Sequence, residues 1–558
     1  MIIFVGEISL VGAPVANVQP SEVIKNGVWK TFTAHNASIH VCDFSPLKDT
    51  ILETEDIALA TSGQPVIEQV ATEKNAQLRY IADALAHDKV DLLNSANGVF
   101  CGFMLEKTSG TLKLFTDYLG LRQIYLYHAK DRLIFSNAYW LIKSSINEDL
   151  TLNIDGIVEL GTLGHALANR TQFNEIELLP PGEVMIIGPQ GKIENHQYFD
   201  LTKTPPSTIS ENEAVIELYE ILMKSVKERC ASANKAFGFL SGGMDSRLLV
   251  HTLKSLGIEM FTANFAPLET RDRVFGEMAA HAIDVHHFQH PNGTLLGDVL
   301  IDTVEAWQAS NSDHNFFSES PYIWSGDGGS VGLGHVYLTD AIEELAASGN
   351  FASCAEMWIK SNNRNIPQRI YQDKNIEQKF CQRISKLLES YGSINPARAP
   401  YYFLMFNDQR RHLDRHYEIF HKRAVDFQLP FFDKRLIRFI ASLPPKWLNN
   451  HRLYDKLYKQ ISGSLISTPW QTYPEHVPCL LPYPNNLKYQ WSDNFHAAHE
   501  ERKIIKTDAM FCLRAAISAS FPEKLFNRLY ILIGSLATLV NLTNHSYIRK
   551  FIEASIKK

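Results

Sequence analysis

A glycine-rich turn between an apolar run and a patterned helix is the part of this sequence best suited to chemistry. The turn reads Ser241-Gly242-Gly243-Met244-Asp245-Ser246 and follows the apolar run Ala236 to Leu240. Glycines let backbone N–H groups approach an anion closely, and a helix N-terminus adds a favourable dipole. Asp245 lies one step into the helix and offers the hard oxygen ligands that Mg²⁺ prefers. The arrangement therefore predicts ATP with Mg²⁺ as the ligand.

The loop differs from the two common phosphate-binding fingerprints. It has neither the G-x-x-x-x-G-K-[ST] pattern nor the G-x-G-x-x-G pattern. It resembles instead the pyrophosphate loop of ATP pyrophosphatases, which cleave ATP to AMP and pyrophosphate while activating a carboxyl or carbonyl group. An ordinary turn between a strand and a helix is the alternative. The resemblance implies these ATP-binding residues in the loop: Phe239, Ser241, Gly242, Gly243, Asp245 and Ser246.

Length and composition indicate a soluble globular protein of two or three domains. The chain has 558 residues, of which 45% are apolar and 21% are charged. Its net charge of −7 argues against a nucleic-acid partner. The seven cysteines form no C-x-x-C pair, which predicts neither a zinc site nor a disulfide framework and suits a cytoplasmic location. The N-terminal residues Met1 to Glu7 lack the features of a signal peptide.

The longest apolar stretch late in the chain runs from Leu529 to Leu542 and includes the polar residues Ser535 and Asn541. It is shorter than the roughly 20 residues that a transmembrane helix needs, so no transmembrane span is expected. A buried helix is the favoured interpretation. Contact with a membrane surface is the alternative, which nearby basic residues support: Arg549, Lys550, Lys557 and Lys558.

The order of patterns along the chain predicts two different folds in succession. Short alternating runs within the first ~200 residues predict strands near 112–117, 123–127, 132–135 and 183–187. The polar, proline-containing segment Thr202 to Thr208 is the best linker. After it, apolar spacing predicts a helix over 211–230, strands over 236–240 and 260–263, and a helix over 272–282. This alternation predicts a parallel sheet with its ligand at the carboxyl ends of the strands. Beyond ~340 the chain reads as mostly helical.

Several motifs in sequence order carry a family resemblance. They are Asn97 to Phe103, Thr116 to Tyr125, Phe135 to Asn137, Leu179 to Glu183, Leu429 to Leu436 and Ser442 to Pro445. Together with the pyrophosphate loop they resemble the glutamine-dependent asparagine synthetases, whose relatives include β-lactam synthetases, lasso-peptide cyclases and synthetase-like proteins of surface-polysaccharide clusters. The resemblance covers about residues 1–475.

The resemblance implies three parts. Residues 1–205 would form a class II glutamine amidotransferase-like domain with the αββα fold of N-terminal nucleophile hydrolases. Residues 206–475 would form an α/β ATP pyrophosphatase domain of the asparagine synthase type. Residues 476–558 would form a helical C-terminal extension.

The amidotransferase-like part departs from the family in three places. Ile2 stands where the nucleophilic cysteine is expected. Thr61-Ser62-Gly63-Gln64-Pro65 stands where the family has Asn-Gly-Glu, and no Arg-Gly-Pro loop is present. We therefore expect this part to be an inactive scaffold, as in β-lactam synthetases.

The synthetase part departs from the family at its second acidic loop. The family reads approximately Ser-Gly-Glu-Gly-Ser/Gly-Asp-Glu, and this chain reads Ser325-Gly326-Asp327-Gly328-Gly329-Ser330-Val331. Ser325 and Gly326 would contact ATP. Asp327 would serve as a second metal ligand beside Asp245 or as the catalytic base, whereas Ser330 and Val331 replace acidic residues. A glycine-rich turn with a capping aspartate is the alternative.

The family also places a lysine after the last helices of the synthetase. The matching segment, Thr468 to Thr472, has none; Lys456 and Lys459 lie earlier and are either substitutes or surface residues. Asp272 matches an acidic position of the family and equally suits an ordinary helix N-terminus.

Two further groups are candidates of lower specificity. Asn407, Arg410 and Arg411 lie in a helical segment and would grip phosphates or a substrate carboxylate, or else cap a solvated face. His286, His287 and His290 are favoured as a solvated strand edge over a metal site.

The expected function is an AMP-forming ligase that adenylates a small-molecule or peptide carboxylate and transfers it to ammonia or an amine, in natural-product or surface-polysaccharide biosynthesis. One alternative is a degenerate, non-catalytic nucleotide-binding member of the family. Another is glutamine-hydrolysing asparagine synthesis itself. The resemblance also leaves a homodimer open.

Overall fold

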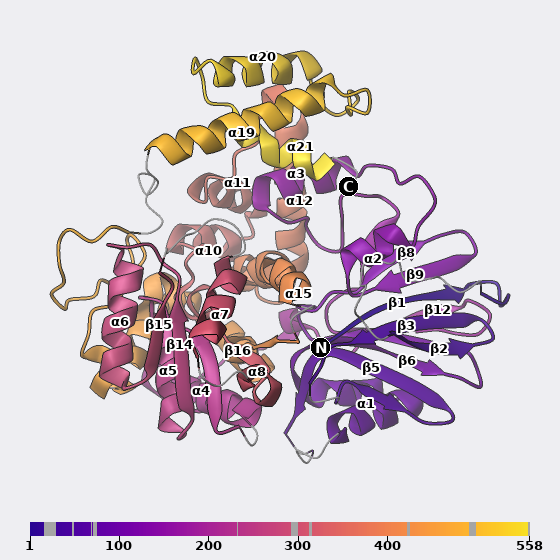
Figure 1. The fold of residues 1–558 in the computed structure, drawn as a ribbon, viewed down its shortest axis with the longest axis horizontal. Coiled ribbons are helices and arrows are strands. Elements are labelled where there is room, and N and C mark those ends of the chain that lie inside the picture. The colour runs from indigo at the N-terminus through magenta and orange to yellow at the C-terminus, as the bar shows by residue number, and fades with distance from the viewer. Residues whose placement is uncertain are drawn as a thin grey trace. The chain divides into compact units, whose positions relative to one another are not determined.

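The computed structural model describes residues 1–15, 29–46, 49–68, 70, 75–230, 233–291, 299–311, 315–420, 424–461, 463–489 and 498–555. They form two compact units, each assembled from three separate stretches of the chain (Figure 1). The first unit contains residues 1–147, 179–340 and 412–490. The second contains residues 148–178, 341–411 and 491–558.

The N-terminal part of the first unit is a sandwich of two antiparallel sheets. One has the order β8-β9-β1-β3-β2 within this unit, and the other has the order β12-β11-β7-β6-β5-β4. The strands of the first sheet are β1 (Ile2–Ser9), β2 (Trp29–Ala34), β3 (Ala37–Asp43), β8 (Tyr125–His128) and β9 (Arg132–Ser136). Those of the second are β4 (Ile51–Glu53), β5 (Ile57–Ile67), β6 (Ala96–Glu106), β7 (Leu112–Thr116), β11 (Glu183–Ile187) and β12 (Ile193–Gln197).

Apolar side chains between the two sheets form the core of the sandwich. Phe4 of β1 meets Phe103 of β6 edge to face, with ring centroids 5.3 Å apart. Both side chains are fully buried, which removes large apolar areas from water. Helix α1 (Ala76–Ala86) packs against β5, and α2 (Tyr139–Ser144) packs against β8 and β9, so each sheet carries a helix.

The second part of the same unit is built on a parallel sheet with the order β15-β14-β13-β16-β17. Its strands are β13 (Lys235–Phe239), β14 (Glu259–Asn264), β15 (His286–Gln289), β16 (Tyr322–Trp324) and β17 (Asp426–Gln428). The chain runs outward from β13 to β15 and then returns to the other side of β13 to form β16 and β17. The strand order therefore reverses between β13 and β16, which is where α/β sheets bind ligands.

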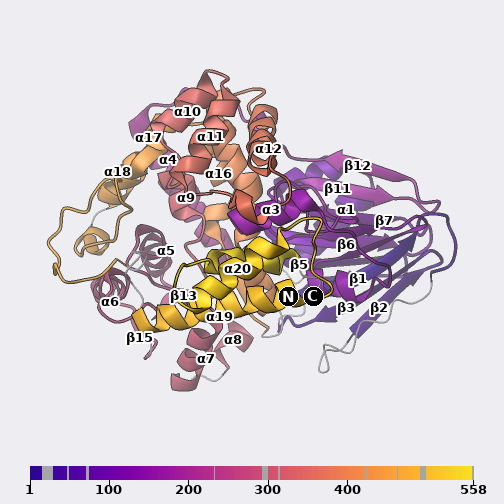
Figure 2. The same cartoon turned by 90° about the horizontal axis from the view of Figure 1, so that it is seen from above.

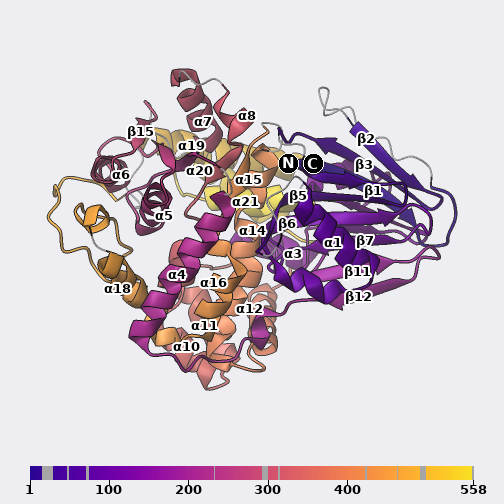
Figure 3. The ribbon, with the colours of Figure 1, turned by 90° about the horizontal axis from the view of Figure 1, so that it is seen from below.

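Helices surround this parallel sheet, and α4 runs beside α16 (Figure 3). The longer helices are α4 (Glu211–Cys230), α5 (Met244–Ser255), α6 (Arg271–Ile283), α7 (Val299–Ser310), α16 (Lys434–Ser442) and α18 (Arg452–Ile461). The shorter ones are α8 (Phe316–Glu319), α9 (Gly329–Gly334), α15 (Asp414–Phe420) and α17 (Pro445–Leu448). The helix predicted over 211–230 is confirmed as α4, and the mixture of α and β structure is confirmed for the chain.

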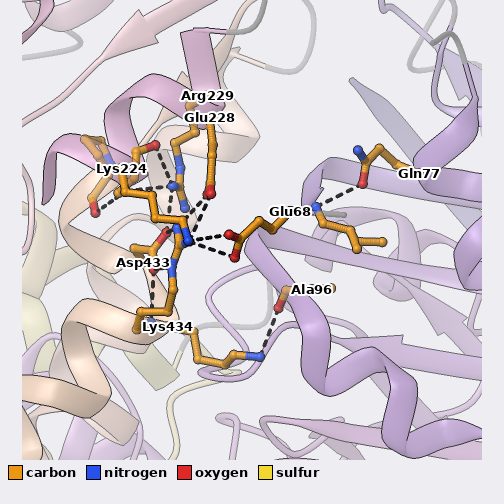
Figure 4. A network of polar contacts seen from close by, with 12 residues as sticks. Glu68, Gln77, Ala96, Lys224, Glu228, Arg229, Asp433 and Lys434 are labelled. Carbon is orange, nitrogen blue, oxygen red and sulfur yellow. Dashed lines mark hydrogen bonds and ion pairs between the residues drawn. The ribbon is translucent and has the colours of Figure 1, made fainter. Parts of the chain in front are cut away.

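A network of ion pairs connects α4 with α16 and reaches the sandwich through the half-exposed side chain of Glu68 (Figure 4). Asp433 is fully buried, and its carboxylate accepts hydrogen bonds from Arg229 at 2.9 Å and Arg435 at 2.8 Å. Arg435 also pairs with Glu228 at 2.6 Å and, in the sandwich, with Glu68 at 3.6 Å. These charged hydrogen bonds fix the position of α16 beside α4.

The second unit is mostly helical. Its elements are α3 (Ile154–Leu163), β10 (Ile176–Leu178), α10 (Asp340–Ala347), α11 (Phe351–Ser361), α12 (Ile376–Tyr391), α13 (Ala399–Phe403), a π-helical turn (Leu404–Gln409), α14 (Arg410–His412), α19 (Ala498–Ile517), α20 (Arg528–Leu539) and α21 (Arg549–Ser555). Helix α19 packs against α20 and α21, and α21 packs against α3 (Figure 2). Gly161 of α3 makes that last contact possible, because a Cβ there would lie 2.0 Å from the Phe551 ring.

The late apolar stretch forms α20, and the prediction that this helix is buried is wrong. Leu529, Ile533 and Leu536 are 66%, 59% and 52% exposed. Of the four nearby basic residues, Lys557 and Lys558 lie outside the described residues. Among the helices that the structure describes, none has both the length and the hydropathy to cross a bilayer. The domain boundaries near residues 205 and 475 remain predictions.

Candidate functional site

The glycine-rich turn lies at the carboxyl end of β13, beside the loop that follows β16. These two strands are the neighbours between which the strand order of the sheet reverses. Gly326, in the second loop, lies so close to the first that a Cβ there would be 2.7 Å from the backbone nitrogen of Ser246. The structure thus brings together both loops that the sequence singled out.

Hydrogen bonds within the first loop hold its two serines in place. The Ser241 N–H donates to Ser246 Oγ at 2.9 Å, and the two hydroxyl oxygens are 2.8 Å apart. The Gly243 N–H donates to Ser241 Oγ at 3.2 Å. Phe239 ends β13, and its ring contacts Phe265 edge to face at 5.7 Å. The loop is therefore ordered by its own side chains, with its amide donors gathered at the helix N-terminus.

Asp272 contacts the loop directly. Its carboxylate accepts a hydrogen bond from the Gly242 N–H at 2.8 Å. Gly242 is needed there, because a Cβ would lie 2.8 Å from the Arg271 carbonyl oxygen. Burial raises the pKa of Asp272 to about 6. Asp272 thus lies in the first turn of α6 and also contacts the first loop. Its interpretation as a helix N-terminal residue and its interpretation as a residue of the candidate site are therefore compatible.

Asp245 lies in the first turn of α5 and faces the second loop. Its Oδ2 accepts hydrogen bonds from the Ser330 N–H at 3.0 Å and the Ser330 hydroxyl at 2.7 Å. Although part of the side chain is exposed, Oδ1 is buried and has no hydrogen-bond partner. Burial, with a smaller contribution from the charge of Asp327, raises the pKa of Asp245 to about 6, although the hydrogen bonds from Ser330 act to lower it.

A cation fits beside Asp245. An orphaned, buried carboxylate oxygen is costly unless a donor or a cation reaches it. Gly329 leaves room beside this oxygen, because a Cβ there would lie 2.5 Å from Asp245 Oδ1. Among the described residues, no group of three or more His, Cys, Asp or Glu side chains is arranged to hold a metal. A metal at this place would thus rely on one or two carboxylates and on oxygen atoms of a ligand.

Asp327 is more exposed and does not contact Asp245 directly. Its carboxylate accepts a hydrogen bond from the Ser325 hydroxyl, and it lies 3.9 Å from His412 Nε2. The side chain of Asp327 is 30% exposed. It therefore acts on Asp245 through its charge in this structure.

The segment from Thr468 to Thr472 lies against the first loop. The Gln471 N–H donates to the Gly242 carbonyl oxygen at 2.8 Å. Arg247 of α5 is fully buried and anchors the segment by donating to the carbonyl oxygens of Thr468 at 2.9 Å and Pro469 at 2.8 Å. The side-chain oxygen of Gln471 is buried without a partner.

Lys456 and Lys459 do not replace the missing lysine. Lys456 pairs with Glu211 at 2.6 Å, and Lys459 pairs with Asp455 at 2.7 Å. Both lysines are about half exposed, which is typical of surface ion pairs.

Two residues of the site were not found from the sequence. Arg247 reads as an ordinary helix residue, yet its guanidinium ties α5 to the segment that begins at Thr468. Tyr454 of α18 is fully buried, and the negative charge of Asp245 helps burial to raise the pKa of its phenol. No local pattern links either residue to the loop, since their partners lie about 200 positions away along the chain.

The lower-specificity candidates have structural roles. Asn407 accepts a hydrogen bond from the Ala168 N–H at 2.7 Å, and Arg411 donates to the Arg170 carbonyl oxygen at 2.8 Å. Arg410, nearly fully buried, donates to the Asn169 side chain at 2.8 Å. These three residues hold one loop of the second unit, and the interpretation that they grip a ligand is not needed.

The histidine group lies on the edge strand β15. His286 stacks on Phe261 at 4.8 Å, and the His287 ring lies 2.9 Å from the Thr262 hydroxyl. Burial lowers the pKa of His287 to about 4. The favoured interpretation of a solvated strand edge fits His286, which is exposed, but not His287, which is partly buried.

A separate cavity of about 140 Å³ lies between the sandwich and the parallel part. Thr61, Gly63, Gln64 and Pro65 contribute to its wall, and none of its described lining residues is a cysteine. Residues that line it include Met1, Gln64, Gln77, Tyr322 and Asp426.

Comparisons with known proteins match the part of the chain that carries the first loop. The asparagine synthase family matches residues 217–322, which contain the first loop and Asp272. Asparagine synthetase [glutamine-hydrolyzing] 1 of Bacillus subtilis (strain 168) is 23% identical over 181 residues. That match covers 32% of this chain and 28% of the relative, so the comparison spans less than a third of the relative's length.

Two solved structures align with this chain at low similarity. One is the glutamine phosphoribosylpyrophosphate (PRPP) amidotransferase from B. subtilis complexed with ADP and GMP, with 12% identity and a TM-score of 0.23, covering 57% of this chain and 84% of that one. The other is the allosteric regulatory enzyme of purine biosynthesis, also with 12% identity and a TM-score of 0.23, covering 46% and 58%. TM-scores this low do not establish a shared fold.

Proposed function

Because the chain belongs to the asparagine synthetase family, we propose that it is an ATP-dependent, AMP-forming ligase. A carboxylate oxygen of the substrate attacks the α-phosphorus of ATP, and pyrophosphate leaves. Ammonia or an amine then attacks the acyl carbon, and AMP leaves with the electron pair of the broken C–O bond. The products are an amide, AMP and pyrophosphate.

The observation that carries this proposal is the position of the first loop. It follows β13 at the reversal of strand order, and it gathers amide donors at the N-terminus of α5. Such a place holds phosphate oxygens through N–H groups and the helix dipole. Ser241, Gly242, Gly243 and Ser246 would hold the pyrophosphate part of ATP, and Ser325 with Gly326 would contact it from the second loop.

Mg²⁺ fits the same place. Asp245 would hold it through its carboxylate, with Asp327 as a second ligand from the neighbouring loop, and the bound ion would neutralise charge on the phosphates. Ser330 keeps the Asp245 carboxylate oriented by two hydrogen bonds. Asp272 already occupies the Gly242 N–H, so a phosphate must displace a carboxylate there.

The acceptor and the nitrogen donor are proposed as classes. A sugar acid, a peptide carboxylate and aspartate all have the required carboxyl group. The segment Thr61 to Pro65 lacks the Asn-Gly-Glu motif of glutamine hydrolysis, and we propose that nitrogen comes from ammonia or an amine. A glutaminase assay tests this: glutamate release above a buffer blank contradicts it.

The decisive experiment compares Asp245→Ala with wild type. Wild type should bind MgATP in calorimetry and catalyse ATP–pyrophosphate exchange with at least one carboxylate from a panel of sugar acids, peptides and aspartate. Asp245→Ala should lose both activities. Asp284→Ala is the matched control, because Asp284 is a 96% exposed aspartate that pairs only with Lys254 among the described salt bridges. Exchange at the wild-type rate in Asp245→Ala would refute the assignment.

A non-catalytic nucleotide-binding member is the second candidate. Two observations favour it: a hydroxyl rather than a carboxylate faces Asp245 at Ser330, and the segment Thr468 to Thr472 brings Gln471 to the loop where the family has a lysine. MgATP binding without exchange for any carboxylate in the panel would support this candidate. Binding together with exchange would exclude it.

A further inference from the structure

Helix α20 buries mostly small side chains and exposes large aliphatic ones. This is the reverse of what is expected of a surface helix. Its buried positions are Ile531, Gly534, Ser535 and Thr538. Its outward positions are all aliphatic: Leu529, Ile533, Leu536 and the adjoining Val540, with exposures from 52% to 66%. Leu542, just beyond, is 77% exposed. An amphipathic surface helix buries its large apolar residues, so this one presents an apolar stripe that lacks a cover.

A basic groove lies beside this stripe in the second unit. Helix α19 supplies most of it, α20 contributes Leu539, and α21 contributes Arg549. Its apolar residues are Met510, Phe511 and Leu539, and its basic residues are Arg502, Lys503, Lys506, Arg514 and Arg549.

Most of this positive charge is available to a partner. Arg549 is already paired with Asp508 at 2.6 Å. Arg502, Lys503, Lys506 and Arg514 form no ion pair with any described side chain, and all four are exposed. Four cations without an ion pair to a described side chain, beside an aliphatic stripe, are complementary to a surface that is both anionic and apolar.

We propose that α19 and α20 dock this protein onto the surface of an anionic phospholipid bilayer. The stripe from Leu529 to Val540 enters the boundary between headgroups and acyl chains, and the basic residues of α19 contact lipid phosphates. Interfacial helices bind in this way, through buried apolar area together with attraction to anionic lipids.

The dimensions of α20 agree with binding at the surface. Its 12 residues span about 18 Å, which is less than the ~30 Å of a hydrocarbon core. The helix therefore lies on the bilayer and does not cross it.

A second copy of the chain fits this surface less well. A symmetric dimer through α20 would place the same patch against itself and bring the cations of two grooves together. A protein partner would have to match the aliphatic stripe and the adjacent cations together, and the exposed side chains of α20 itself offer no hydrogen-bonding group.

The test is flotation of the full chain with vesicles of phosphatidylcholine, with and without phosphatidylglycerol. Wild type should float with the anionic vesicles and stay at the bottom with the neutral ones. Each basic side chain near the surface strengthens binding roughly fivefold, so Lys503→Glu/Lys506→Glu should weaken binding about 25-fold or more. Lys89→Glu/Lys130→Glu is its control, because it removes the same charge from exposed lysines outside the groove.

A second variant tests the stripe independently. Ile533→Ser/Leu536→Ser should weaken binding at least about tenfold, because apolar area no longer enters the bilayer. Both side chains are more than half exposed, so circular dichroism should be unchanged. Leu480→Ser, at a residue 84% exposed in the first unit, should bind as wild type does.

Three outcomes would overturn the proposal. They are equal binding to neutral and anionic vesicles, wild-type binding by both groove and stripe variants, and a dimer that Ile533→Ser/Leu536→Ser converts to a monomer while no vesicle binding occurs. The measurement does not depend on catalysis, so it is independent of the proposed ligase activity.

Discussion

Asp433 is a fully buried carboxylate held between two guanidinium groups, and replacing it with Asn will destabilise the first unit. The substitution keeps the size of the side chain. It also keeps an oxygen that can accept a hydrogen bond from the backbone N–H of Arg435, which lies 3.0 Å from Oδ1 in the wild-type protein. It removes the negative charge that compensates Arg229, whose side chain is only 2% exposed. An uncompensated buried charge is among the most costly defects in a protein core.

The magnitude follows from the pKa of Asp433. Burial alone would raise it, but hydrogen bonds and charge from Arg435 and Arg229 lower it from 3.8 to about 2. A difference of almost two pKa units corresponds to about 2.5 kcal/mol. Breaking a buried pair by removing one partner typically costs 3–5 kcal/mol, so Asp433→Asn should lower the free energy of unfolding by about 2–4 kcal/mol at pH 7.

The sign of the pH dependence is also defined. Because the pKa of Asp433 is lower in the folded state, its stabilisation is complete above about pH 4 and is lost as the pH falls towards 2. Urea unfolding followed by tryptophan fluorescence should thus show a large difference between Asp433→Asn and wild type at pH 7 and 5, and a small one near pH 2.

Two variants serve as controls for this measurement. Asp284→Asn changes an exposed aspartate and should alter stability by less than about 0.5 kcal/mol. In an Arg229→Met background, Asp433→Asn should cost less, since the uncompensated cation is gone. An unchanged midpoint in Asp433→Asn at pH 7, or the same loss in both backgrounds, would refute the reasoning.

Three other perturbations address the candidate site. Ser330→Ala removes a 2.7 Å hydrogen bond to Asp245 and should raise the pKa of Asp245 above about 6, so calorimetry should show MgATP binding weakening more at pH 6 than at pH 8. Asp272→Ala frees the Gly242 N–H and removes a carboxylate, so it should strengthen pyrophosphate binding several-fold at pH 7. The affinity of the wild type should approach that of the variant as the pH falls below 6. Weaker binding by the variant would contradict this. Arg247→Met leaves buried carbonyl groups unpaired and should make residues 468–472 a new site of limited proteolysis, with about 2–4 kcal/mol lost on unfolding.

Local pattern was enough to predict the elements that carry the loop. The strand expected over 236–240 is β13, and the helix expected over 272–282 is α6, with ends displaced by a residue or so. Helix α4 agrees at both ends, because acidic residues begin it and its apolar spacing persists to Cys230. The parallel sheet was also predicted, since alternating strands and helices allow few other arrangements.

Contacts between distant segments were beyond the sequence. The sequence gives no sign that Arg247 is buried; it is buried because the segment at Thr468 supplies carbonyl acceptors. Helix α20 was expected to be buried on the strength of its hydropathy, which does not say which face a helix turns inward. Gly534 and Thr538 fit the inward face, and the leucines are left outside.

Three buried aspartates have a raised pKa, but they differ in how their carboxylate oxygens are hydrogen-bonded. Burial raises the pKa of Asp117, Asp245 and Asp272 alike to about 6, so the shift alone does not mark a site. The carboxylate of Asp117 accepts hydrogen bonds from three backbone N–H groups, at residues 119, 121 and 122, and its role is complete without a ligand.

Asp245 differs because one of its oxygens has no partner. Ser330 donates two hydrogen bonds to Oδ2, whereas Oδ1 is buried beside Gly329 and accepts no hydrogen bond. A ligand that brings a cation would remove this penalty, whereas one that brings only phosphate oxygens would increase it. The same argument applies to Asp272, whose charge opposes a phosphate at the Gly242 N–H until it is protonated or neutralised. We therefore expect nucleotide to bind here only together with a divalent cation, and free ATP in the presence of a chelator to bind at least about tenfold more weakly than MgATP.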